Sequence, residues 1–157
     1  LMETLGSAGY EHYEISNFCR PGMYSRHNTS YWKGIPYLGC GPSAHSFNTD
    51  TREWNISSLE DYIHSIENNH RRFENEYLDR TTRYNECIMT SIRTKRGLSL
   101  NDLEREFGKE LWQYCMNMAR PHLDSGKLEI RDSHLCLTRK GIFVSDSIMS
   151  DLMFIED

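Results

Sequence analysis

The chain has 157 residues, of which 38% are hydrophobic and 26% are charged, a composition that favours a folded protein over a disordered tail. Its 23 acidic residues outnumber its 18 lysines and arginines, and a net charge of −5 argues against nucleic acid as a partner. No apolar run approaches the roughly 20 residues that span a bilayer, and the first ten residues lack the features of a signal peptide. We therefore expect a cytoplasmic protein and, because Leu1 precedes Met2, a segment of a longer one.

The first fifty residues are rich in glycine, proline and aromatic side chains. Residues 1–10 predict the end of a helix that closes on Gly9, and residues 12–18 (HYEISNF) alternate as a strand does. A long irregular loop is expected from about residue 19 to 36, followed by a short strand at 37–41 (YLGCG). This order is typical of α/β architecture, in which ligands gather at the carboxyl ends of strands.

After residue 50 the hydrophobic spacing becomes helical. Ser57 or Ser58 can cap a first helix, and a second helix is expected at about 80–94, with Gly97 as its stop. Their apolar faces should consist of Leu59, Tyr62, Ile63 and Ile66 in the first helix and of Tyr84, Ile88 and Ile92 in the second.

The remaining residues follow the order of a winged-helix module. Ser99 caps a helix that ends at Gly108, a helix at 109–126 meets Pro121, which should kink it or end its regular part, and a hairpin at 127–138 precedes a last helix. The expected inward side chains are Leu100, Leu103, Phe107, Leu111, Tyr114 or Cys115, Met118 and Leu123.

A winged helix can bind DNA, but the charges here argue against it. The helix that would enter the major groove offers only Lys109, Arg120 and His122 as basic groups. The alternative is that the module packs against another domain. We expect His122 and His134 to lie at the surface or in the hairpin, and His64 and His70 on the polar side of a helix.

The five cysteines show neither a zinc nor a disulfide pattern. They are odd in number and widely spaced, with no C-x-x-C pair and no nearby histidine partner. Reduced thiols are the simplest expectation. The cysteines are Cys19, Cys40, Cys87, Cys115 and Cys136.

The segment from residue 14 to 47 holds the candidate binding residues. Acidic and amide groups end the first predicted strand, and an imidazole and two large aromatic rings follow in the long loop, where they suit a metal or a planar ligand. A glycine turn then allows close backbone approach. By residue chemistry alone, a ligand site and a rigid interdomain loop are equal alternatives. The candidates are Glu14, Asn17, His27, Asn28, Tyr31, Trp32, Gly39, Gly41, Ser43, Ala44 and His45.

The run GYEHYEISNFCRPGMYSRHNTSYWKGIPYLGCGPSAHSF resembles the oxygen-independent coproporphyrinogen III oxidase-like proteins, which are radical S-adenosylmethionine (SAM) proteins of tetrapyrrole metabolism. The resemblance is closest to the haem-chaperone-like branch, which shares the YEISNF, RHN-x-x-YW and AHS motifs. TKRGLSL and LTRKG resemble the family's C-terminal domain, so that the resemblance covers essentially the whole chain.

The resemblance implies an α+β fold made of three parts. Residues 1–50 would be the C-terminal strands of a partial (β/α) radical SAM barrel, 51–75 a connecting helix, and 76–157 a winged-helix-like domain. It also implies a 4Fe-4S cluster and SAM in the parent protein, with the cluster held by a C-x-x-x-C-x-x-C loop upstream. No cysteine here has that spacing, so we expect no metal site and no catalysis in this chain alone.

For function, the resemblance implies haem binding and transfer by a chaperone-like protein. It makes His27 the candidate axial ligand, Asn28 an orienting group, and Tyr31 and Trp32 pocket walls. The other candidates would lie beside SAM or tetrapyrrole. Expected partners are haem or a porphyrinogen, membrane-associated haem acceptors, and further copies of the chain through exposed strand edges.

Two alternatives remain from the sequence. The parent could be an oxygen-independent coproporphyrinogen III oxidase, which converts coproporphyrinogen III to protoporphyrinogen IX by radical decarboxylation. The third hypothesis is a DNA-binding winged helix, which predicts salt-sensitive binding to duplex DNA.

Overall fold

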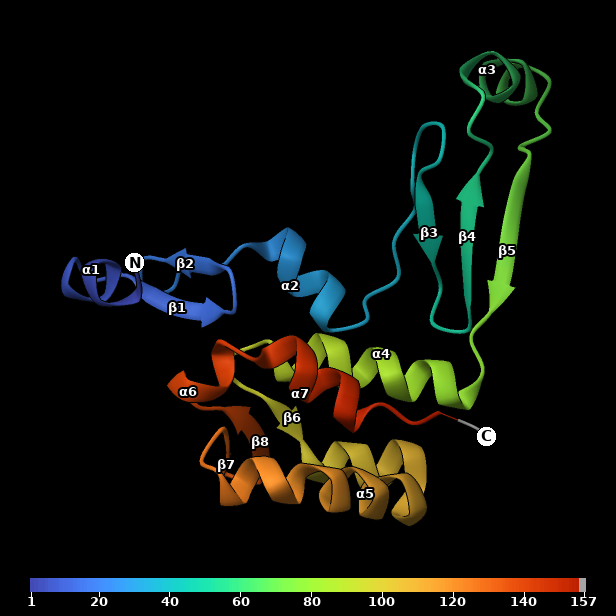
Figure 1. Cartoon of the computed structure of the whole chain (residues 1–157). Coiled ribbons are helices and arrows are strands. Elements are labelled where there is room, and N and C mark those ends of the chain that lie inside the picture. Colours follow the sequence, from blue (N-terminus) through green and yellow to red (C-terminus); the bar gives the residue numbers. More distant parts are fainter. Residues whose placement is uncertain (156–157) are drawn as a thin grey trace. The chain divides into compact units, whose positions relative to one another are not determined.

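The computed structural model describes residues 1–155 and has the mixed α+β content expected from the sequence (Figure 1). Contacts divide the chain into two compact units. Unit 1 consists of Leu1–Trp32 and Arg80–Asp157, and unit 2 of Lys33–Asp79. The division of this chain at residues 50 and 75, which the family resemblance implies, stays a prediction.

Near its N-terminus, unit 1 contains a hairpin where the sequence predicted one strand. Strands β1 (Glu11–Glu14) and β2 (Asn17–Cys19) pair antiparallel. The chain reverses between them because the Glu14 carboxylate accepts hydrogen bonds from the backbone N–H of Ser16, at 3.1 Å, and from the Asn17 side chain. A side chain that binds the backbone two residues on stabilises a turn, and this overrides the alternating pattern.

Two short helices flank this hairpin. Helix α1 (Met2–Ser7) ends before Gly9, as predicted, and Gly9 has a φ of 81°. The predicted irregular loop contains α2 (Arg26–Trp32), so that prediction was wrong for these seven residues. The helix begins where the Ser25 hydroxyl accepts a hydrogen bond from the Asn28 N–H at 3.2 Å, the usual N-cap arrangement. So short and polar a helix lacks the apolar period by which helices are recognised.

The rest of unit 1 is a helical domain with a three-stranded antiparallel sheet of order β6-β8-β7. The predicted start of the second helix, the Ser99 cap and the hairpin are confirmed. The hairpin turns at Asp132 and Ser133, whose φ values of 48° and 61° suit a two-residue turn. The elements are α4 (Arg80–Ile92), β6 (Leu98–Ser99), α5 (Leu100–Asp124), β7 (Leu128–Arg131), β8 (His134–Leu137), α6 (Arg139–Ile142) and α7 (Ser145–Leu152).

Helix α5 differs from expectation in two details. It breaks at Gly108, as predicted, where φ is 74°, but it continues through Pro121 to Asp124. His122 is buried rather than at the surface, because it faces α7 and its Nε2 lies 3.0 Å from the Asp151 carboxylate. The last predicted helix is divided into α6 and α7.

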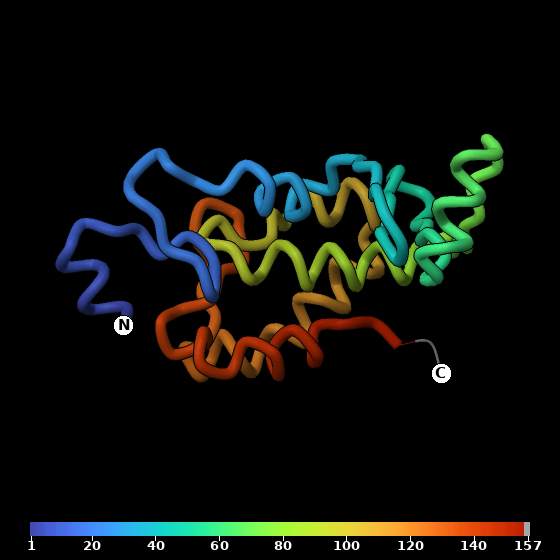
Figure 2. The backbone as a smooth tube through the Cα atoms, turned by 90° about the horizontal axis from the view of Figure 1, so that it is seen from above, coloured from blue at the N-terminus to red at the C-terminus, as the bar shows by residue number. Residues whose placement is uncertain are grey.

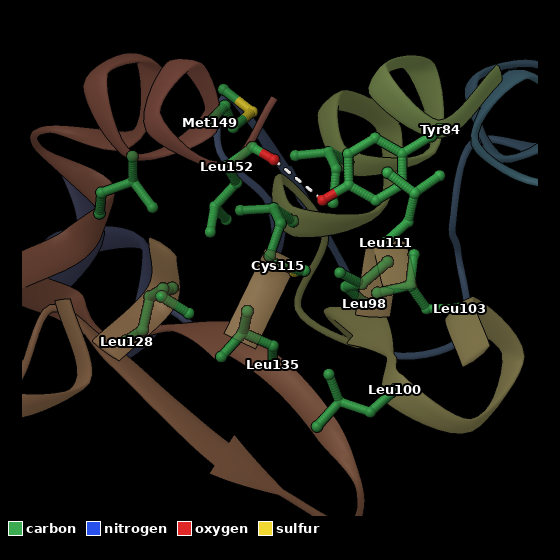
Figure 3. Packing of buried hydrophobic residues seen from close by; sticks show 14 of the residues in the cluster. Tyr84, Leu98, Leu100, Leu103, Leu111, Cys115, Leu128, Leu135, Met149 and Leu152 are labelled. Carbon is green, nitrogen blue, oxygen red and sulfur yellow. Dashed lines mark hydrogen bonds between the residues drawn. The ribbon is translucent and has the colours of Figure 1, made fainter. Parts of the chain in front are cut away.

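The core of unit 1 lies between α4, α5, α7 and the small sheet (Figure 3). The Tyr84 hydroxyl donates to the Leu152 carbonyl oxygen at 3.0 Å, which satisfies the one polar group of that side chain inside the cluster. Met118, which was expected to point inward, is 37% exposed. The predicted side chains found in the core are Tyr84, Ile88, Ile92, Leu100, Leu103, Phe107, Leu111 and Cys115.

Unit 2 contains an antiparallel sheet of order β3-β4-β5, which the sequence did not reveal. Its strands are β3 (His45–Phe47), β4 (Thr51–Asn55) and β5 (Phe73–Tyr77), and all five residues of β5 are exposed. The expected strand at 37–41 was wrong: only Tyr37 pairs, in an isolated bridge with Phe47. Strands this short and polar give no clear alternating pattern.

Helix α3 (Leu59–Glu67) forms as predicted and begins at Ser58, whose hydroxyl accepts from the Asp61 N–H. Its predicted apolar face is not buried within the described chain, because Leu59, Ile63 and Ile66 are all exposed.

Candidate functional site

Helix α2 carries the four residues predicted to bind haem or a related substrate. His27 and Tyr31 are four residues apart and so share one face of the helix. Both side chains are exposed, and their rings meet edge to face with centroids 4.9 Å apart. Asn28 and Trp32 are only half exposed. The accessible part of this group is therefore the His27–Tyr31 face.

Trp32 is held by packing within unit 1. Its ring meets that of Tyr13 at an angle of 62°, with centroids 5.8 Å apart. Tyr13 is buried, comes from β1, and also contacts Tyr24, with ring centroids 5.3 Å apart. Tyr13 thus touches the segment before α2 and the last residue of α2, a role that the sequence patterns did not reveal.

Glu14 and Asn17 contact each other at the turn of the hairpin. The Glu14 side chain is 1% exposed and also receives a hydrogen bond from Arg93 Nε at 2.6 Å. Burial alone would raise the pKa of Glu14, but the hydrogen bonds from Arg93 and from the turn outweigh it, so the pKa lies below its usual value. Glu14 is thus an ionised carboxylate with protein partners, and its predicted place beside a cofactor stays a prediction.

Packing within unit 2 explains why position 39 in the turn is a glycine. A Cβ atom at this position would overlap the backbone carbonyl of His45, so only glycine fits. The Gly39 N–H donates to the Ser46 hydroxyl at 3.0 Å. Close approach of backbone to backbone therefore accounts for this glycine without a ligand.

Asn55 holds the same turn from β4. Its side-chain amide donates to the carbonyl oxygens of Gly39 and Gly41, at 3.2 and 2.9 Å, and the Gly41 N–H donates to the Tyr62 hydroxyl at 3.1 Å. Asn55 is 2% exposed. A buried asparagine in a strand is a signal that the turn needs a polar partner, and the sequence interpretation missed it.

The last candidates follow this turn. Ser43 has a φ of 56° and donates its N–H to the Ile56 carbonyl oxygen at 3.2 Å, and Ala44 follows it. The exposed His45 ring lies 5.9 Å from that of Trp54, centroid to centroid. The candidates thus lie in three groups: the hairpin turn with Glu14 and Asn17, helix α2, and the turn in unit 2. Their functional roles stay predictions.

The described residues do not fit an iron–sulfur cluster. Within residues 1–155, no three His, Cys, Asp or Glu side chains come together as metal ligands. Burial raises the pKa of Cys87 and of Cys115 to about 11, so both are thiols at neutral pH. Over the same range, no helix combines the length and apolar content that crossing a bilayer requires.

Comparison with known proteins gives the family. Residues 78–144 match the HemN C-terminal domain. The heme chaperone HemW of Mycobacterium tuberculosis is 31% identical over 153 residues, which cover 95% of this chain and 36% of that protein. The chain is HemN/HemW-like. The family resemblance seen in its motifs is thereby confirmed.

Two further relatives agree with this assignment. The heme chaperone HemW of Bacillus subtilis is 26% identical over 149 residues, or 94% of this HemN/HemW-like chain and 39% of that protein. The solved structure described as "Coproporphyrinogen III oxidase (HemN) from Escherichia coli is a Radical SAM enzyme" matches with a TM-score of 0.71 and 17% identity, over 97% of this chain and 39% of that one, and shows the fold. The chain spans a little over a third of the length of these HemW relatives.

Proposed function

We propose that this chain is the haem-handling C-terminal part of a HemW-like haem chaperone. The observation that carries the proposal is the exposed face of α2, where the His27 imidazole stands beside the Tyr31 ring. A neutral imidazole nitrogen can ligate haem iron, and an exposed aromatic ring can pack against a porphyrin plane.

The charge distribution supports an anionic ligand. Residues 15–49 contain Arg20, Arg26 and Lys33 but no aspartate or glutamate, although the whole chain has a net charge of −5. Arg26 is exposed and precedes His27 directly. Haem carries two propionate groups, and a cationic segment in an otherwise acidic chain attracts such carboxylates.

The remaining residues have supporting roles in this proposal. Asn28 orients the ligand, Trp32 completes one wall of the site, and the turn from Gly39 to His45 lies beside tetrapyrrole or SAM in the parent protein. In this proposal, the parent protein holds the 4Fe-4S cluster and SAM through residues outside the described chain. The parent works in the cytoplasm and passes haem to membrane-associated acceptors. The names of the HemW relatives support the haem part of this proposal.

The oxidase alternative has support from the fold alone, because the solved coproporphyrinogen III oxidase is 17% identical. It predicts that the full-length parent forms vinyl product from coproporphyrinogen III under anaerobic conditions.

Hemin titration tests the proposal. We expect the 157-residue chain to give a saturable change in the Soret band, and His27→Ala to bind at least about tenfold more weakly, since a lost axial ligand removes a metal bond. His64→Ala is the matched control, because His64 is an exposed helical histidine on α3. Equal titrations of wild type, His27→Ala and His64→Ala would remove His27 as the ligand.

A further inference from the structure

The hairpin of unit 1 is joined to the segment that follows α4. The Lys95 N–H donates to the Tyr13 carbonyl oxygen, and the Ile15 N–H donates to the Arg93 carbonyl oxygen, each at 3.0 Å. Both bonds lie beside an antiparallel bridge between the two segments. Figure 2 shows the hairpin at the end of α4, so residues about 80 positions apart in the sequence are neighbours.

An ion pair with a buried carboxylate reinforces this junction. Arg93 Nε donates to Glu14 Oε1 at 2.6 Å, and the Glu14 side chain is 1% exposed while that of Arg93 is 37% exposed. The hairpin supplies the carboxylate, and the HemN C-terminal domain supplies the guanidinium. Charge-assisted hydrogen bonds of this length are stronger than neutral ones, and loss of one partner leaves the other unpaired.

The side chain of Tyr13 connects this junction to α2. Tyr13 is next to Glu14 on β1, where the register of the hairpin shifts, and both residues are buried. The Tyr13 ring contacts Trp32 at the end of α2 and Tyr24 just before it. Helix α2 also contacts α4 directly. The ion pair, the strand and the aromatic contacts therefore form one continuous connection from the C-terminal domain to α2.

We propose that Glu14, Arg93 and Tyr13 are positioning residues, through which the HemN C-terminal domain holds α2 and sets the orientation of its His27–Tyr31 face. None of the three needs to touch the ligand. The consequence for haem rests on the proposed function, whereas the positioning of α2 follows from the contacts of unit 1.

Hydrogen exchange of the 157-residue chain, followed by mass spectrometry without hemin, tests the positioning directly. In Glu14→Gln we expect the amides of α2 to exchange about tenfold faster or more, the factor that corresponds to one charged hydrogen bond, with the core of α4 and α5 unchanged within about twofold. The matched control is Glu106→Gln, which removes the exposed pair of Glu106 with Arg83, 3.0 Å apart in the same unit. It should leave α2 at the wild-type rate.

A second pair of variants separates the ring from the carboxylate. Tyr13→Phe keeps the contacts with Trp32 and should match wild type, whereas Tyr13→Leu should accelerate exchange in α2 as Glu14→Gln does. Unchanged exchange in α2 for Glu14→Gln and Tyr13→Leu, or equal acceleration throughout unit 1, would overturn the proposal.

Hemin titration of the same variants separates this proposal from the proposed function. If both hold, Glu14→Gln binds hemin about tenfold more weakly but keeps the wild-type Soret maximum, because His27 is still the ligand, whereas His27→Ala changes that maximum. If His27→Ala matches wild type, the haem proposal fails, and the exchange data still decide whether these residues position α2.

Discussion

Replacing Gly97 with alanine should strongly destabilise unit 1. Gly97 has a φ of 79°, and an added Cβ would overlap the Leu135 carbonyl oxygen and lie 2.6 Å from Cys136 Sγ. A left-handed alanine costs about 1–2 kcal/mol, and insertion of a methyl group into a packed site costs about 1–3 kcal/mol. The expected loss in the free energy of unfolding is therefore about 2–5 kcal/mol, a large part of the stability of a small domain.

Alanine variants at two other glycines measure the backbone cost and the overlap cost separately. Gly126 has a φ of 66° with nothing within 4 Å of an added Cβ, so Gly126→Ala should lose only the backbone part, about 1–2 kcal/mol. Gly141 has no positive φ, but its Cβ would overlap the Lys127 carbonyl oxygen, so Gly141→Ala reports the overlap, about 1–3 kcal/mol.

Urea unfolding followed by far-UV circular dichroism measures all three variants. We expect Gly97→Ala to lose more than Gly126→Ala and about as much as the two control variants combined. Equal losses for Gly97→Ala and Gly126→Ala would refute the close packing of Gly97 against β8.

Two further predictions concern titratable groups. Because burial raises the pKa of Cys87 and Cys115 to about 11, both thiols should resist alkylation at pH 8 in the folded chain, while the exposed Cys40 reacts first. Peptide mapping after brief labelling measures the order of reaction. Early labelling of Cys115 would contradict the prediction. Because the pKa of Glu14 is lowered on folding, its stabilising contribution is complete above the ordinary glutamate pKa of about 4.3 and is lost as the pH falls through the lower folded value. The unfolding free energy of Glu14→Gln should therefore fall less steeply than that of wild type below about pH 4.3, and parallel curves in urea titrations would argue against the ion pair with Arg93.

The helical domain could be predicted from the sequence because its elements carry strong local signals. Tyr84, Ile88 and Ile92 recur every four residues, and all three are completely buried. Ser99 and Gly108 mark the start and the break of α5 as their chemistry predicts. In this part of the chain, local propensity and tertiary packing agree.

The N-terminal elements could not be predicted in the same way, because long-range contacts decide them. The Glu14 side chain turns the chain at Ser16 and pairs with Arg93, which is 79 residues away. Helix α2 has seven mostly polar residues, and its inner side is defined by Tyr13. Periodicity within one segment contains no information about such partners.

The arrangement of the candidate residues could not be predicted from the sequence, and their roles stay predictions. The motif identified His27, Tyr31 and Trp32, and the structure adds that the first two share an exposed face while Trp32 packs inward. The sequence interpretation assigned the glycine turn to close approach of a ligand. In the structure, the turn at Gly39 is closed by backbone contacts and by a hydrogen bond from Asn55. Close approach of two backbone segments leaves only the glycine as its sequence signal.

Chemical rescue of the ligand position tests the central claim most directly. In His27→Gly, the imidazole is deleted from an exposed helical position, so the fold should be retained. We predict that His27→Gly with hemin lacks the wild-type Soret spectrum, and that millimolar free imidazole restores it, because imidazole replaces the missing ligand at the iron. A wild-type spectrum for His27→Gly without added imidazole would contradict the account.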